Sequence, residues 1–410
     1  MIRSLENLPG IKERKQELIE KLLGNEILHE ELIELRDKVN AEDLSDILQR
    51  IYDLNETYIY KLAAVETMVE KLNKIKNRQR NQVFFKKIRK GFRKLNDNLS
   101  NNDSPGDNPH ITVVAEGDSW FNYPIILTDI IDRIIMEKDL AVYSIASGGD
   151  WLLNMLTGRQ YVEELSISHP DWFLISGGGN DLVGARRLAT ILQPGGESVE
   201  FEKSEWAQHL ILDFAEKSII PLKEDFHEGL PFLSKDFYAL LMFFHLQYYF
   251  LFKGLLKTED NCVSKFEGLK IITQGYDYPL PSSDKKFGIN PVRWYIPFAR
   301  TFLGHGGWLK TPLQIRGINA ERSQQKVLYS MIYLFNEMMI ELGDIFNKRH
   351  PEQRIFHIDS RDSVGKGGWT DELHPTPVHF IKIGQTFIDC IKRRKAPTYG
   401  NVYVVKTCNP

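Results

Sequence analysis

Cysteine is scarce in this sequence, with 3 residues in 410, at positions 262, 390 and 408. These cysteines are odd in number and far apart, whereas disulfide frameworks and zinc sites need closely spaced cysteines. The pattern therefore indicates neither a disulfide-stapled domain nor a cysteine-ligated metal site. We expect no metal and no cofactor, and a reducing compartment, the cytoplasm, as the location.

Long apolar runs are also missing. The first 24 residues are charged throughout, so no signal peptide is predicted. The uncharged stretch Phe237–Phe252 has 16 residues and contains His245 and Gln247, whereas a bilayer span needs about 20 apolar residues. We expect a helix in the core or at a dimer interface. A surface for an apolar substrate or a membrane is the first alternative, and a true span is the last.

Acidic residues are absent from the basic segment Lys71–Lys94, which carries 11 basic side chains, although the net charge of the chain is only −3. Residues 1–70 carry 16 acidic and 9 basic side chains. A solvated helix face is the ordinary explanation of such a run. Peripheral contact with an anionic membrane, contact with nucleic acid, and pairing with the acidic first 70 residues are the alternatives, nucleic acid being the least favoured partner.

Proline does not occur between Pro9 and Pro105, and apolar residues recur at helical spacing over much of this stretch. Residues 1–95 are therefore predicted to form two or three long helices. We interpret them as an α-helical domain for regulation, assembly or targeting, and a homo-oligomer formed through these helices is one expectation. Residues 96–110 are rich in turn-forming residues and poor in apolar ones, as is typical of a linker.

Residues 111–395 show a different pattern, in which short apolar runs alternate with helical stretches. The runs begin at Ile111, Leu140, Asp171, Leu269 and Arg354. Continuous apolar runs are typical of strands buried on both faces, and the helical stretches between them predict a parallel sheet. The predicted fold class is a three-layer α/β domain with a helical insertion at about 185–265, followed by a C-terminal tail at 396–410.

Small and polar residues follow each of the five runs. In open parallel sheets, ligands bind beyond the carboxyl ends of the strands. The segments that reach this rim are Gly117–Ser119, Ser147–Asp150, Gly177–Asp181, Gly275–Pro279, and Asp359 followed by Trp369–Pro375. Their coincidence predicts one functional site at the rim of the sheet.

Ser119, His374 and Asp371 have the chemical properties of a nucleophile, its base and the partner of that base. A serine hydroxyl needs an adjacent base near neutral pH, and histidine suits this role. Asp371, three residues before His374, could bond the other imidazole nitrogen. The backbone N–H groups of Ser119 and Gly149 and the Asn180 amide are the candidate donors to an oxyanion.

Each of these residues also has an ordinary structural interpretation. Ser119 alone would be a turn residue, and Asn180 alone would be a helix N-cap. Their combination with His374 and Asp371 favours catalysis. Four residues could line a substrate pocket, with core packing or another structural role as the alternative: Trp120, Trp151, Tyr276 and Asp277.

Four blocks of the sequence resemble, in order, those of the SGNH/GDSL hydrolase superfamily. They are Gly117-Asp118-Ser119, the glycine before Asp150, Gly178-x-Asn180-Asp181, and Asp371-x-x-His374-Pro375. The resemblance covers roughly residues 110–395 and implies a flavodoxin-like sheet and ester hydrolysis without a metal. It implies Ser119 as nucleophile, His374 as base, Asp371 as its partner, and Ser119, Gly149 and Asn180 as the oxyanion hole. Trp120 marks a "GDSW" branch, and the N-terminal helices have no counterpart in the minimal fold.

The sequence thus predicts a metal-independent serine ester hydrolase, an esterase or lipase whose substrate is an ester with an apolar acyl part, such as a lipid or phospholipid. A carbohydrate or small-molecule O-acetyl esterase is the nearest alternative. A binding or assembly protein, in which the helical arm makes the essential contact, is the alternative from another class. A metallophosphoesterase using Asp118 and Asp181 lacks the histidine-rich ligand set of such sites.

Overall fold

The computed structural model describes residues 73–91, 110–123, 128–194, 225–256, 266–281, 308–348 and 354–406, with a few isolated positions elsewhere. The chain divides into two compact units, Met1–Met68 and Val69–Pro410. Within the first unit, only positions between 16 and 21 are described, and they are helical. The rest of the predicted domain up to residue 68, and residues 96–109 of the predicted linker, lie outside the described residues.

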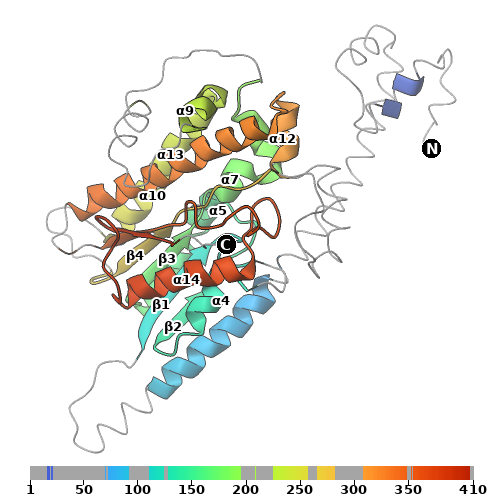
Figure 1. Cartoon of the computed structure of the whole chain (residues 1–410). Helices are drawn as coiled ribbons and strands as arrows, with labels where there is room; N and C mark the ends of the chain where they lie inside the picture. The colour runs from blue at the N-terminus through green and yellow to red at the C-terminus, as the bar shows by residue number, and fades with distance from the viewer. Residues whose placement is uncertain are drawn as a thin grey trace, which may run out of the picture. The chain divides into compact units, whose positions relative to one another are not determined.

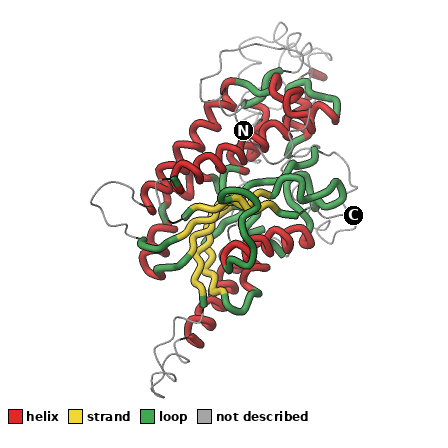
Figure 2. The backbone as a smooth tube through the Cα atoms, turned by 60° about the vertical axis from the view of Figure 1, so that its left-hand side comes forward, coloured by secondary structure: helices red, strands yellow, loops and turns green. Residues whose placement is uncertain are grey.

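The second unit is built on a six-stranded parallel sheet (Figures 1 and 2). Its strands are β1 (Ile111–Gly117), β2 (Leu140–Ser144), β3 (Trp172–Ser176), β4 (Lys270–Gln274), β5 (Ile355–Asp359) and β6 (Val402–Val404). The order is β2-β1-β3-β4-β5-β6, and every neighbouring pair is parallel. The first five strands are the five predicted apolar runs, and their order is that of flavodoxin-like sheets.

The C-terminal tail predicted at 396–410 is corrected by the structure. Val402–Val404 pair in parallel with β5 as the edge strand β6. The sequence signal is weak because three residues are too few for a periodicity. Val402–Val404 are therefore part of the sheet.

Helices cover both faces of the sheet and make the three predicted layers (Figure 1). One face carries α4 (Ile130–Ile135) and α14 (Pro377–Ile391), which contact each other and the strands beneath them. The other face carries α5 (Leu152–Gly158), α6 (Gln160–Ser168) and the long α13 (Glu321–Asn347). Strands covered on both sides need apolar residues on both sides, which is why β3 and β5 are buried along their whole length.

Another group of helices lies in the long connections around β4. They are α7 (Gly179–Val183), the 3-10 helices η2 (Gly184–Thr190) and η3 (Leu230–Phe232), α9 (Asp225–Gly229), α10 (Lys235–Leu256) and α12 (Lys310–Ile315). The predicted insertion at 185–265 contains most of η2 and all of α9, η3 and α10. Residues 195–207, 209–224 and 257–265 of the insertion lie outside the described part of the chain.

The predicted aromatic helix is α10, which contacts α13. Among the described helices, it alone is long and apolar enough to cross a membrane by length and composition. However, Phe244, Tyr248 and Phe252 on one of its faces are fully buried. Phe244 packs edge-on against Phe335 of α13, and Tyr248 donates a hydrogen bond to the Gly177 carbonyl oxygen. This face is packed as expected of a core helix, whereas other large apolar side chains of α10 are exposed.

The basic helix, residues 73–91, belongs to the same unit as the sheet. It lies beside α4 and β2 in Figure 1. The Lys87 ammonium donates to the carbonyl oxygens of Ile135 at the end of α4 and of Leu140 in β2, 2.7 Å each. Phe84 packs edge-on against Tyr143 of β2. The compact unit thus begins before the predicted linker, and this helix is one of its outer elements.

Candidate active site

The turn after β1 brings Ser119 to the rim of the sheet. Asp118 shapes this turn, because its carboxylate accepts the Trp120 backbone N–H at 3.0 Å. Gly117 is required by close packing, since a Cβ there would lie 2.9 Å from the Ser176 carbonyl oxygen of β3 and 2.9 Å from the Phe121 ring. The strand can therefore end against its neighbour only with glycine at this position.

Ser119, His374 and Asp371 form a continuous chain of hydrogen bonds. Ser119 Oγ lies 2.7 Å from His374 Nε2, and His374 Nδ1 lies 2.9 Å from both carboxylate oxygens of Asp371. Two of these residues are 255 positions apart in the sequence. The fold thus brings together the three side chains that the sequence singled out, at distances suited to proton transfer.

A compact turn before α14 holds His374 and Asp371 in place. Asp371 Oδ1 accepts the backbone N–H groups of Leu373 and His374, 2.8 Å each. The Thr370 N–H donates to the His374 carbonyl oxygen at 2.8 Å and closes the turn. Burial would raise the pKa of the Asp371 carboxyl, but the His374 imidazole and these N–H donors outweigh burial and lower the pKa. Asp371 therefore remains a carboxylate.

The loops after β2 and β3 contact each other. Gly149 has φ +86°, a conformation that favours glycine, and its backbone is exposed. The Asn180 amide donates to the Asp150 carbonyl oxygen at 2.8 Å, which orients the side chain. An amide carries two N–H bonds, so one remains for a ligand. Asp181 accepts the Leu152 N–H at 2.9 Å and ties the start of α5 to the β3 loop.

Three of the four residues predicted to line a pocket are buried and make structural contacts. Trp120 is 4% exposed and lies edge-on between Tyr276 and Phe380. The Tyr276 hydroxyl donates to Asp118 Oδ2 at 2.5 Å and accepts the Gly179 N–H at 3.1 Å. These contacts favour the packing alternative for Trp120 and Tyr276, because the two large rings beside Ser119 hold the loops after β1, β3 and β4 together.

Asp277 also has a structural position. Its buried carboxylate accepts the backbone N–H groups of Asp362 at 2.7 Å and Val364 at 2.6 Å, and so joins the loops after β4 and β5. Burial raises its pKa to about 7, although these N–H donors oppose the shift. These contacts favour the structural alternative for Asp277, and its place in a pocket stays a prediction. Trp151, the fourth of these residues, is half-buried, and the Arg187 guanidinium lies 4.7 Å from the centre of its ring.

Two residues near the triad make contacts that the sequence did not predict. The Tyr123 hydroxyl donates to Asp371 Oδ2 at 3.1 Å, and its ring lies edge-on, 4.5 Å from the His374 ring centre. The backbone N–H of Tyr123 donates to Asp129 Oδ2 at 3.1 Å. The one signal for Asp129 is its place before the apolar start of α4, where it forms a capping box with Asp132.

No group of three or more His, Cys, Asp or Glu side chains suited to a metal ion occurs among the described residues. Neither a protein family nor a curated protein matches the sequence. The comparison with solved structures gives matches at low TM-scores. The chain is similar in structure to several esterases and lipases.

A GDSL-like lipase from Parabacteroides merdae is 11% identical, with 70% of this chain and all of that chain covered, at a TM-score of 0.29. An acetylxylan esterase from Geobacillus stearothermophilus is 11% identical, with 68% and 93% covered, at a TM-score of 0.32. A phospholipase A1 from Streptomyces albidoflavus is 13% identical, with 70% and 100% covered, at a TM-score of 0.32. At scores this low, the reaction is inferred from the residues of this chain alone.

Proposed function

We propose that this protein is a serine ester hydrolase that works through an acyl-enzyme on Ser119. The observation that carries the proposal is the hydrogen-bonded chain from Ser119 Oγ through both nitrogens of His374 to the Asp371 carboxylate. This arrangement makes a serine hydroxyl nucleophilic, and a serine that only forms a turn does not require it.

In the acylation step, His374 Nε2 takes the Ser119 proton while Oγ bonds to the carbonyl carbon of the ester. The Asp371 carboxylate keeps the other proton on Nδ1 and stabilises the imidazolium that forms. His374 then gives the proton to the departing alcohol, and the ester C–O bond breaks. A water molecule activated by the same imidazole cleaves the acyl-enzyme, which restores Ser119 and releases the acid.

The oxyanion of each tetrahedral intermediate needs donors already in place. We assign this role to the backbone N–H groups of Ser119 and Gly149 and to the second N–H of the Asn180 amide. Their loops follow three neighbouring strands, β1, β2 and β3. The turn at Gly149 and the contact of Asn180 with Asp150 hold two of these donors before substrate arrives.

The acyl group of the substrate is the finer part of the proposal. Trp120 and Tyr276 suggested an apolar acyl group from the sequence, but both are used in packing. The half-buried Trp151, one residue beyond the Asp150 carbonyl that holds Asn180, is an aromatic side chain still placed to meet a substrate. We therefore propose an ester of a hydrophobic or short acyl group, with lipid esters and O-acetyl esters as the two classes to compare.

A fluorophosphonate probe and a series of p-nitrophenyl esters from acetyl to decanoyl test this function. We expect wild type and Ser168→Ala, a matched serine on α6, to be labelled and active with EDTA present. Ser119→Ala should be unlabelled and at least about 10⁴-fold slower in kcat. Hydrolysis that survives Ser119→Ala would disprove the nucleophile. The chain length with the highest kcat/KM decides between the two ester classes.

A further inference from the structure

The basic helix faces the rim of the sheet with a row of asparagines at every fourth position. Asn73 Nδ2 donates to Ser147 Oγ at 3.0 Å and to the Gly148 carbonyl oxygen at 3.2 Å. Asn77 Nδ2 donates to the Ala146 carbonyl oxygen at 2.8 Å. Asn81 bonds both backbone groups of Ser144, the last residue of β2. Residues four apart lie on one face of a helix, so this row follows the chain from the end of β2 toward Gly149.

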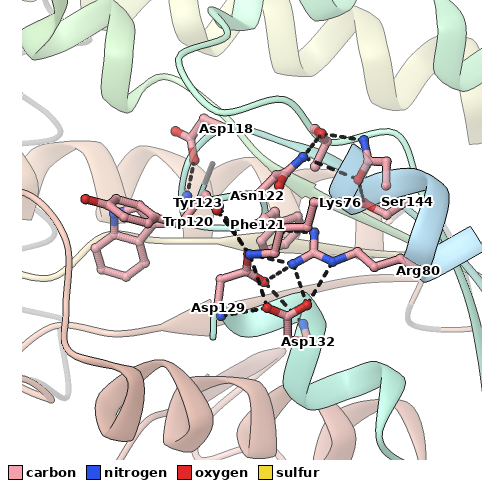
Figure 3. Close-up of polar contacts among 12 residues, drawn as sticks. Lys76, Arg80, Asp118, Trp120, Phe121, Asn122, Tyr123, Asp129, Asp132 and Ser144 are labelled. Atoms are coloured by element: carbon pink, nitrogen blue, oxygen red, sulfur yellow. Dashed lines mark hydrogen bonds and ion pairs between the residues drawn. The ribbon is translucent and has the colours of Figure 1, made fainter. Parts of the chain in front are cut away.

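The same helix also holds the loop that carries the nucleophile (Figure 3). The Arg80 guanidinium is buried, donates to the Phe121 carbonyl oxygen at 2.9 Å, and pairs with the Asp129 carboxylate at 2.6 Å. The Lys76 ammonium donates to the Tyr123 carbonyl oxygen at 3.1 Å and to Asp129 at 2.6 Å. Moving a buried charged group away from its partners would leave it unpaired, which is costly. These contacts therefore hold the helix and the loop in one arrangement.

From this loop the contacts continue to the triad. Asp129 accepts the Tyr123 backbone N–H, and the Tyr123 hydroxyl donates to Asp371. The helix therefore contacts the two loops that carry the proposed oxyanion donors Gly149 and Ser119. Its effect on Asp371 passes through Tyr123.

We propose that the N-terminal end of the basic helix is a positioning element of the active site, and that Asn73 is the positioning residue for the Gly149 loop. The inference rests on the proposed function. Asn73 touches neither the triad nor the oxyanion, and acts by holding the Ser147 hydroxyl and the Gly148 carbonyl oxygen. Gly149, the next residue, is exposed, and the Asp150 N–H donates to the Ser147 carbonyl oxygen at 3.1 Å to close the turn around it.

Asn73→Ala and Asn81→Ala form a matched pair for the test. Each removes two hydrogen bonds between the basic helix and the β2 segment, but only Asn73 bonds the loop next to Gly149. We expect Asn73→Ala to lower kcat by about tenfold or more with little change in KM, because small displacements of catalytic groups are costly in rate. Asn81→Ala should keep the wild-type kcat. Thermal unfolding of both variants measures any loss of stability.

Two further variants separate hydrogen bonding from packing. Asn73→Leu keeps about the size of the side chain but removes both N–H donors, and we expect the same loss of kcat as in Asn73→Ala. Ser147→Ala removes one acceptor and leaves the helix unchanged, and we expect a loss of a few fold. This variant keeps the inference testable if the changes at Asn73 prevent folding.

The rate of fluorophosphonate labelling at Ser119 distinguishes the two proposals. Labelling should slow in Asn73→Ala in parallel with kcat. Wild-type protein that is neither labelled nor active would overturn the proposed function. Active, labelled wild type together with equal kcat in the Asn73→Ala and Asn81→Ala variants would overturn the positioning role alone, as would equal losses that follow the fall in melting temperature.

Discussion

The rim of the sheet, where the proposed catalytic residues lie, and the basic helix contact the same loops in different ways. The rim consists of separate strand ends, and its side chains bond to one another over as many as 255 positions of sequence. The basic helix is one continuous element, and its asparagines and Lys87 bond mainly to main-chain groups. A reacting group needs one neighbour at one distance, whereas a loop needs several main-chain contacts to stay in place. Catalysis and positioning can therefore use different residues of the same rim.

The largest loss of activity is expected from a change on the rim, at Asp371. Asp371→Asn keeps the shape of the side chain but removes its negative charge. The variant therefore no longer stabilises the imidazolium as the carboxylate does. We expect kcat for a p-nitrophenyl ester to fall by about 10⁴-fold. Asp139→Asn, an exposed carboxylate paired with Lys392, should keep the wild-type kcat. A loss below tenfold at Asp371 would mean that this residue positions the turn and does not act on His374.

A smaller loss of activity is expected from a change at Asn180. This residue has features of both reacting and positioning residues, because its amide bonds Asp150 and is also assigned to the proposed oxyanion hole. Asn180→Ala should lower kcat by about 10² to 10³-fold with KM little changed. Asn154→Ala is the matched control, since its amide also bonds Asp150, at 3.0 Å, but from the exposed face of α5. If both variants lose the same activity, Asn180 is a positioning residue like Asn73.

The smallest expected change is in the unfolding free energy, and it concerns Asp118, which shapes the turn at Ser119. Burial raises its pKa to about 6, against the opposing hydrogen bonds from Tyr276 and Trp120. Between the unfolded pKa near 4 and the folded pKa near 6, the native state binds the extra proton, so unfolding free energy falls as pH rises. The total fall in unfolding free energy is up to roughly 3 kcal/mol, and it is complete above pH 6.

Asp118→Asn removes this titration. Denaturant unfolding between pH 4 and 8 should show the stability of wild type falling relative to the variant up to about pH 6, and a constant difference beyond. Parallel curves over the whole range would show that the Asp118 carboxyl has the same pKa in both states. Such a result would place its role in geometry alone, like the asparagines of the basic helix.

Much of the rim could be predicted because its signals are local. Gly117-Asp118-Ser119 and Asp371-x-x-His374 each lie in one short segment, directly before or after an apolar run or a helix start. Parallel strands bring their carboxyl ends to one edge, so five local patterns were sufficient to predict one site. The Asp371–His374 contact is itself local, because the turn that closes between Thr370 and His374 makes it.

The basic helix was harder to predict, because its partners are 41 to 75 positions away. Its charge run is compatible with lipid, nucleic acid or solvent, since nothing local shows that Arg80 is buried against Asp129. Asparagines at every fourth position were a readable signal, but polar side chains on a helix are ordinarily exposed. The positions of Trp120 and Tyr276 were hard to predict for the same reason, because a large ring next to a candidate nucleophile can face either the substrate or the core.

The sequence by itself determined the strands, the strand ends and the chemical identity of Ser119, His374 and Asp371, because burial on two faces and small residues at turns are properties of short segments. Only the tertiary structure decided what holds those strand ends. It buried Trp120 and Asp277, added β6 to the sheet, and laid the basic helix against the loops after β1 and β2. These contacts join residues far apart in the chain, and their free energy arises only when both partners are in place.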